Sequence, residues 1–263
     1  VLQNLVDQKF PVNDDMKEDA ATIIKQIKSA YKSNYGDNYK DSLNQALTSA
    51  GYKNLSEYRQ RMIKQIQYAN FLLDYIDDHF DDVFNDYYQQ CAPKYVSLIK
   101  ISVSDTSSPT DDETSKLNEV KELISNTDKS FGDIAQDYSD DSTSSKKGSL
   151  GIVDSKDTSG IANSYGKDVF NAIEALSEGQ VSDVITGDDG YYFVKVTSTD
   201  KKTLKKELKK TDIDSPLLAY DDYLQYVVYN SYKINYKDKD IKKIVQEVVN
   251  KALEERKTER GEA

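Results

Sequence analysis

The chain has 263 residues, of which 37% are hydrophobic and 31% charged, a length that favours two domains over one. Its formal net charge of −11 argues against nucleic-acid binding, because contact with phosphates requires clustered lysine and arginine. Cys91 is the only cysteine, which excludes an intrachain disulfide and a thiolate metal cluster. No stretch approaches the roughly 18 apolar residues of a membrane span.

Residues 1–93 show helical spacing of apolar residues and no alternating strand pattern. Helices are predicted over 1–10, from a cap at Asp14 or Asp15 to about Tyr31, over 38–49, and over 57–88 after Ser56, with a break near 79–82. We therefore assign residues 1–93 to an N-terminal helical domain.

In residues 94–200 the residue patterns predict a mixture of strands and helices. The patterns predict strands at 94–103, 152–153, 184–185 and 191–196, and helices at 113–126, 131–138 and 169–176. Ser130 is placed to cap the second of these helices. The predicted order is β-α-α-β-α-β-β.

Three spaced motifs in this region carry a family resemblance. Residues 130–153 read SFGDIAQDYSDDSTSSKKGSLGIV, followed by Gly179-Gln-Val-Ser and by Gly190-Tyr-Tyr-Phe-Val-Lys-Val196. This order resembles the parvulin family of peptidyl-prolyl isomerases. The resemblance implies a four-stranded antiparallel sheet with flanking helices over residues 94–200.

Residues 201–263 return to helical patterns: a basic stretch at 201–210, a Tyr-rich stretch at 217–232 and an amphipathic helix at 239–256. The phrases VLQNLV at the start and GYKNLSEYR from Gly51 resemble the N-terminal part of PrsA/SurA-type foldases. That resemblance implies that residues 201–263 pack back on the N-terminal helices. The expected fold class is α+β, with the parvulin-like domain inserted in an all-α N/C-terminal domain.

Two charged faces repeat with the same period. Aspartates at 74, 78, 82 and 86 and lysines at 201, 205 and 209 both recur every four residues. The acidic helix 74–86 could dock on the basic helix 201–210, or both faces could be solvated, in which case each exposed pair contributes only ~0–1 kcal/mol.

The resemblance also implies site residues. Parvulins place a Cys or Asp at the end of the Tyr-Ser-x-Asp loop, between a histidine in the first strand and another in the last. The corresponding positions here are Asp141, Lys100 and Tyr192. The single histidine, His79, lies in the N-terminal helices, so both family histidines are absent. Asp141 is either the remaining catalytic group or a turn cap.

The proline pocket of the family maps onto Leu150 of Gly148-Ser-Leu-Gly and onto Val169 or, with a slip of one residue, Phe170. The stretch 152–166 is polar and lacks the expected Met and Phe. No cofactor or metal is expected, because prolyl isomerisation only requires twisting of a C–N bond with a barrier near ~20 kcal/mol. We interpret His79 and its neighbouring aspartates as a solvated face.

The implied function is that of an extracytoplasmic foldase that assists secreted, not-yet-folded polypeptides. It would sit on the outer face of a Gram-positive-type membrane through a lipid anchor that precedes Val1 in the full-length precursor. The alternatives are a non-catalytic holdase or assembly factor that uses the parvulin fold as a binding scaffold and, less favoured, a surface adhesion or structural protein. Retention of isomerase turnover and formation of a homodimer are left open.

Overall fold

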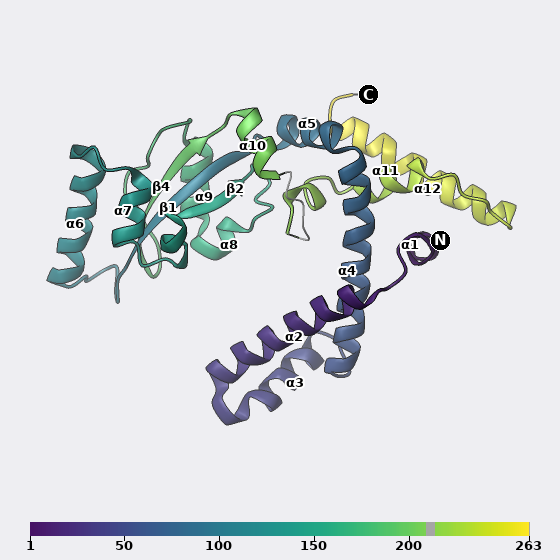
Figure 1. Ribbon diagram of the computed structural model, residues 1–263, viewed down its shortest axis with the longest axis horizontal. Helices are drawn as coiled ribbons and strands as arrows, with labels where there is room; N and C mark the ends of the chain where they lie inside the picture. The colour runs from purple at the N-terminus through teal and green to yellow at the C-terminus, as the bar shows by residue number, and fades with distance from the viewer. Residues whose placement is uncertain (209–213, 263) are drawn as a thin grey trace. The chain divides into compact units, whose positions relative to one another are not determined.

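The computed structural model describes residues 1–208 and 214–262 (Figure 1). The chain divides into two compact units, Val1–Phe80 with Thr211–Ala263, and Asp81–Lys210. The second unit carries a four-stranded antiparallel sheet, and the described part of the first is helical, which confirms the predicted α+β class. Within the described residues, no helix combines the length and hydrophobicity that crossing a bilayer requires.

The first unit, here the helical unit, is built from both ends of the chain. Its elements are α1 (Leu2–Lys9), α2 (Asp14–Tyr35), the 3₁₀ turn η1 (Gly36–Asn38), α3 (Tyr39–Ser49), α4 (Leu55–Asp78), the 3₁₀ turn η3 (Pro216–Leu218), α11 (Leu224–Ser231) and α12 (Lys239–Glu259). The cap of α2 differs from the prediction, and α4 begins two residues before the predicted start at Glu57. Asn13 caps α2 by accepting from the Met16 amide at 2.9 Å, and Asn54 caps α4 by accepting from the Glu57 amide at 3.0 Å. In α2 the side-chain oxygen that the first helical amides require thus comes from Asn13 and not from Asp14 or Asp15. In α4 it comes from Asn54.

Apolar packing joins α2 to α4 in the helical unit. The buried cluster between them consists of Met16, Ala20, Ile24, Met62, Ile63 and Ile66. Further along α4, the Phe71 ring lies between Phe10 and Tyr232, with centroids at 5.8 and 5.6 Å. Because Tyr232 follows α11, this aromatic contact fastens the returning C-terminal segment onto the N-terminal helices.

A buried carboxylate holds α12 in place. Asp221, only 6% exposed, accepts from Arg256 Nε at 2.8 Å and from Arg260 Nη2 at 2.9 Å. Two guanidinium groups compensate for the desolvation of this carboxylate, so the turn before α11 and the last turn of α12 are tied together.

The elements of the second unit, here the sheet unit, are α5 (Phe80–Cys91), β1 (Lys94–Ser102), α6 (Asp111–Asn126), α7 (Phe131–Tyr138), the 3₁₀ turn η2 (Ser142–Lys146), β2 (Ser149–Val153), α8 (Ile161–Tyr165), α9 (Lys167–Ala175), β3 (Ile185–Thr186), β4 (Gly190–Ser198) and α10 (Lys201–Leu208). This unit contains the seven predicted elements in the predicted order, with η2 and α8 between them and with α5 before and α10 after them. The predicted break of the long helix is confirmed, at His79. The predicted domain boundaries at 93/94 and 200/201 stay predictions; α5 from Asp81 onward and α10 fall within this unit.

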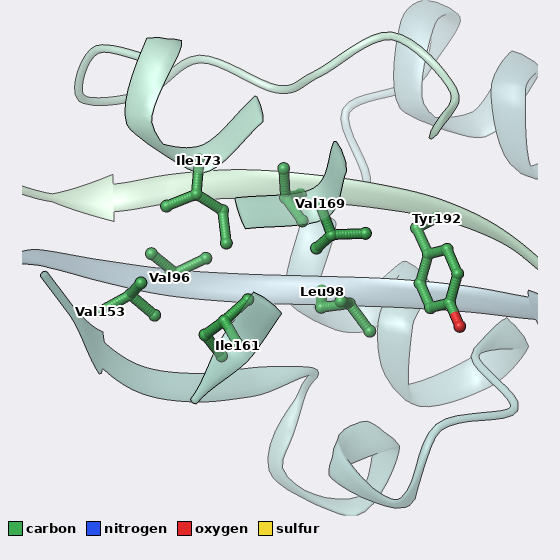
Figure 2. Packing of buried hydrophobic residues seen from close by; sticks show 8 residues of the cluster. Val96, Leu98, Val153, Ile161, Val169, Ile173 and Tyr192 are labelled. Carbon is green, nitrogen blue, oxygen red and sulfur yellow. The ribbon is translucent and has the colours of Figure 1, made fainter. Parts of the chain in front are cut away.

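The sheet runs in the order β2-β1-β4-β3 and separates two apolar clusters. Successive side chains of a strand point to opposite faces, so β1 contributes Val96 and Leu98 to one cluster and Ile99 and Ile101 to the other. The first cluster is covered by α8 and α9 and is shown in Figure 2, with Tyr192 at one end of the row. The second is covered by α6 and α7.

Hydrogen bonds in the sheet unit tie α5 to the loop after β2. The Tyr87 hydroxyl donates to Asp154 Oδ2 at 2.8 Å, and both residues are fully buried. Burial, followed by the charge of Asp154, raises the pKa of Tyr87. The Cys91 carbonyl also accepts from the Ser155 amide at 2.9 Å. α5 is thus an integral part of the sheet unit.

An ion pair joins Lys205 of the basic face to Asp81, which lies beside the acidic face in the sequence. Lys205 Nζ lies 2.8 Å from Asp81 Oδ1, linking α10 to the start of α5, and the Asp81 side chain is 72% exposed. An exposed pair of this kind stabilises by ~0–1 kcal/mol. Lys209 and Lys210 of the predicted basic helix lie outside the described residues.

Gly148 occupies a position that excludes a side chain. Its φ is +75°, and a Cβ there would lie 2.3 Å from the Leu98 carbonyl oxygen and 2.8 Å from the Ala135 Cβ. The Gly148 carbonyl accepts from the Leu98 amide at 2.8 Å, so the backbone cannot easily move away. This glycine therefore fixes the approach of the η2 loop to β1.

We predict that Gly148→Ala lowers the free energy of unfolding by at least about 3 kcal/mol, from the left-handed backbone and the overlap together. Gly151→Ala is the matched control, since Gly151 has φ +83° and open space around its Cβ position. It should cost only about 1–2 kcal/mol. Urea unfolding of the full chain measures both, and equal losses would contradict the steric account.

Candidate functional site

Strand pairing brings two of the three predicted site residues together. Lys100 of β1 and Tyr192 of β4 are register partners in the antiparallel ladder and share the face that α8 and α9 cover. The Lys100 ammonium lies 5.7 Å from the centroid of the Tyr192 ring, within range of a cation–π contact. The two positions that hold histidines in parvulins are therefore adjacent here, as a cation beside a phenol.

Asp189, in the turn before β4, binds both of them. Its carboxylate forms an ion pair with Lys100 and accepts a hydrogen bond from the Tyr192 hydroxyl. The hydrogen bond from Lys100, and then that from Tyr192, lowers the pKa of Asp189. The turn itself is closed by the Gly187 amide, which donates to the Gly190 carbonyl at 2.9 Å.

Gly187 also makes room for the ring. A Cβ at this position would lie 2.6 Å from Tyr192 Cε2. The absence of a side chain at Gly187 thus lets the Tyr192 ring lie beneath the turn, with its hydroxyl pointing away from the aliphatic cluster (Figure 2).

Backbone hydrogen bonds hold the Asp141 loop against β1. The Ser139 hydroxyl accepts from the Lys100 amide at 3.0 Å, and the Asp140 amide donates to the Lys100 carbonyl at 2.8 Å. Asp141 itself caps η2, accepting from the Thr143 amide at 2.8 Å and from its hydroxyl at 2.6 Å. Asp141 therefore caps η2 through Oδ1, and its catalytic role stays a prediction.

Tyr165, at the end of α8, links the Asp141 loop to Tyr192. The two tyrosine rings meet edge to face with centroids 6.2 Å apart. Burial, and then the negative charge of Asp141, raises the pKa of Tyr165. Burial, and then the hydrogen bond to Asp189, raises the pKa of Tyr192. Both hydroxyls therefore stay protonated at neutral pH.

A cavity of about 430 Å³ opens beside these residues. It is lined by Ala162, Asn163, Ser164, Tyr165, Gly166, Lys167, Asp168, Val169, Ile185, Thr186, Gly187, Asp188, Asp189 and Tyr192. Val169, 1% exposed, forms part of its wall, whereas Leu150 and Phe170 pack against the apolar cluster and are not among the lining residues. The cavity is more polar than the proline pocket that the resemblance implies, and the binding roles of Leu150, Val169 and Phe170 stay predictions.

Tyr165 and Asp189 were not singled out from the sequence. Asp189 lies in an Asp-Asp-Gly turn directly before a strand, a local signal that places a carboxylate at the strand end. Tyr165 has no comparable signal, because α8 has only five residues. Among the described residues, no group of three or more His, Cys, Asp or Glu side chains is arranged to hold a metal ion.

Comparison with known proteins agrees with this geometry. Residues 98–198 match the family model described as the rotamase, or PPIC-type PPIASE, domain. The chain carries a parvulin-type domain. The match runs from Leu98, within β1, to the end of β4 and includes Lys100, Asp141 and Tyr192.

Curated relatives point to one group of proteins. The foldase protein PrsA of Staphylococcus aureus (strain MRSA252) is 32% identical over 141 residues, or 51% of this chain, and that of Staphylococcus epidermidis (strain ATCC 12228) matches to the same extent. The chain spans 41% of the length of these relatives. The chain is thus similar to PrsA foldases.

Two crystal structures of PrsA proteins give weaker likenesses. PrsA from Bacillus subtilis is 21% identical with a TM-score of 0.40, covering 91% of this chain and 83% of that one. PrsA from Streptococcus pneumoniae is 19% identical with a TM-score of 0.45, covering 94% and 86%.

The lowered pKa of Asp189 predicts a pH dependence of stability. Near pH 4 the folded chain binds fewer protons at this site than the unfolded chain, whose aspartates titrate at about 3.9. The stabilisation is therefore present above that value and is lost as the pH falls through the lower, folded value. We expect the stability difference between the wild type and Asp189→Asn to shrink from pH 5 to pH 3 in urea melts.

Asp188→Asn is the control for this experiment, because it removes an adjacent carboxylate that lines the same cavity. Its stability difference from the wild type should change less over the same range. An equal change for both variants would contradict the assignment to the contacts of Asp189 with Lys100 and Tyr192.

Proposed function

We propose that this chain is a foldase-type chaperone that acts outside the cytoplasm on unfolded secreted polypeptides. Its parvulin-type domain would bind proline-containing segments at the cavity beside Tyr192. The observation that carries the proposal is the match of residues 98–198 to a rotamase domain, in which Tyr192 lines that cavity and Lys100 pairs with the lining residue Asp189. The similarity to PrsA foldases supports the role and the location.

The chemistry available at this site is limited to stabilising a twisted amide. Tyr192 can donate a hydrogen bond to the substrate carbonyl, because its raised pKa keeps the phenol protonated. This donor is bound to Asp189 in the free protein, so the substrate must compete for it. Lys100 is likewise paired with Asp189, and Asp141 is occupied by Thr143. We infer a degenerate site with weak isomerase turnover.

A binding-only role is the second candidate, favoured by the same internal pairing. Each polar group at the family's catalytic positions already has a partner within the chain. A domain of this kind could serve as a scaffold for a holdase or assembly factor that holds client segments without isomerising them.

A lipid anchor on the precursor and a homodimer are further parts of the proposal.

A protease-coupled assay with a proline-containing peptide tests the catalytic part on the full chain. We expect a rate above buffer that Tyr192→Phe lowers by about ten-fold, through loss of the hydroxyl that would donate to the carbonyl. Tyr138→Phe is the matched control, since its hydroxyl binds Glu119 at 2.8 Å and does not line the cavity. A wild-type rate equal to buffer would retire the isomerase claim, and suppression of client aggregation by the same protein would then favour the holdase.

The isomerase rate, where measured, should be flat between pH 6 and pH 8. The sequence has a single histidine, His79, which belongs to the helical unit, so no imidazole titrates in the cavity. The pKa of Asp189 is lowered and that of Tyr192 is raised, so both move away from this window. An inflection near pH 6.5 in a profile of kcat/KM would show that the assignment of the site is wrong.

A further inference from the structure

The helical unit contains a second cavity, of about 490 Å³, between α2 and the start of α4. It is lined by Ala21, Ile24, Lys25, Lys28, Leu55, Ser56 and Arg59. Ile24 is buried and Leu55 is half-buried, and both belong to the packing between α2 and α4, so the floor is apolar. Lys25, Lys28 and Arg59 are exposed at the rims. We call this cavity the cationic groove.

No carboxylate from the part of the chain that the structure describes lines the cationic groove. Its lining has three cations and no carboxylate, in a protein whose formal net charge is −11. Among the described residues, neither lysine nor the arginine forms an ion pair; Arg59 donates instead to the Lys17 carbonyl at 3.4 Å. An apolar floor between unpaired cations complements a ligand that carries both carboxylates and an apolar group.

The dimensions of the cationic groove indicate the size of that ligand. Its α2 rim runs from Ala21 to Lys28, which at 1.5 Å per residue spans about 10 Å. An extended peptide advances about 3.3 Å per residue, so about three residues fit along it. The cavity beside Tyr192 differs in charge, since its lining includes three aspartates, at 168, 188 and 189, and one lysine.

We propose that the cationic groove binds short extended acidic segments of client polypeptides, with an apolar side chain on Ile24 and Leu55 and carboxylates against Lys25, Lys28 and Arg59. This inference rests on the proposed chaperone function and names the chemistry of the segments that the helical unit holds. The sheet unit and the helical unit would then select different features of a client, a proline segment and an acidic–apolar segment.

Fluorescence anisotropy with the full chain tests the proposal. The probe is a labelled Gly/Ser-flanked peptide with the core Asp-Leu-Glu, compared with the cores Asn-Leu-Gln and Asp-Ser-Glu. We expect the amide core and the serine core each to bind about ten-fold more weakly, because one removes the charge and the other the apolar group. Equal affinity for all three cores would overturn the proposal.

The variant Lys25→Glu/Lys28→Glu should weaken binding of the Asp-Leu-Glu peptide by at least about ten-fold. Lys237→Glu/Lys239→Glu is the control with the same net charge, since both lysines are exposed in the helical unit and do not line the groove. Far-UV circular dichroism verifies that both variants fold. An equal loss in the control would assign the effect to overall charge and overturn the proposal.

Inorganic tripolyphosphate serves as a competitor that lacks apolar groups. Displacement of the peptide only at concentrations well above the peptide's Kd supports a peptide site, whereas displacement below it would overturn the proposal in favour of a phosphate site. Failure of the chaperone function is seen separately, as loss of aggregation suppression by the wild type. Wild-type suppression without peptide binding would reject the groove alone.

Discussion

β1 and β4 pair from Tyr95 opposite Ser198 to Ser102 opposite Gly190, and the candidate site is positioned by this pairing. The antiparallel register sets Lys100 beside Tyr192 and, through alternation, directs both to the face that α8 and α9 cover. A shift of one residue would turn the side chains of one strand to the opposite face of the sheet and separate Lys100 from Tyr192. The same aliphatic packing that stabilises the sheet therefore fixes the geometry of the polar groups at its end.

The polar groups of the site form a closed set of contacts. Asp189 binds Lys100 and Tyr192, and Asp141 binds Thr143 and lies near Tyr165. In such a set each substitution changes the environment of the next group, so single variants do not report independent contributions. The site is thus better understood as one network at the mouth of a polar cavity than as separate catalytic residues.

The fold could be predicted from the sequence because its signals are local and periodic. The β1 alternation and the cap at Ser130 both describe short segments, and both are found in the structure. The site could be predicted only in part. Lys100, Asp141 and Tyr192 follow from aligned motifs, but their partners depend on tertiary contacts.

The contacts of Asp189 and Tyr165 show why the sequence did not identify these two residues. Asp189 reaches Lys100 only after a turn returns the chain to β4, and Tyr165 reaches Tyr192 only because the five-residue α8 packs on the sheet. Neither relation leaves a periodic pattern. The cap of α2 was missed for a simpler reason, since Asn13 directly precedes Asp14 and Asp15, whose side chains have equally suitable oxygens.

The buried pair of Tyr87 and Asp154 has a practical consequence for work with fragments. A segment cut at Lys94 would retain Asp154 in the loop after β2 but lose the phenol that donates to it at 2.8 Å. Asp154, buried in the intact protein, would then lack one of its donors, and loss of one partner of a buried polar group typically destabilises by about 1–3 kcal/mol. Weak binding or turnover by such a fragment would then result from its lower stability and not from the properties of the site. A fragment that keeps the contacts of the sheet unit must therefore include α5.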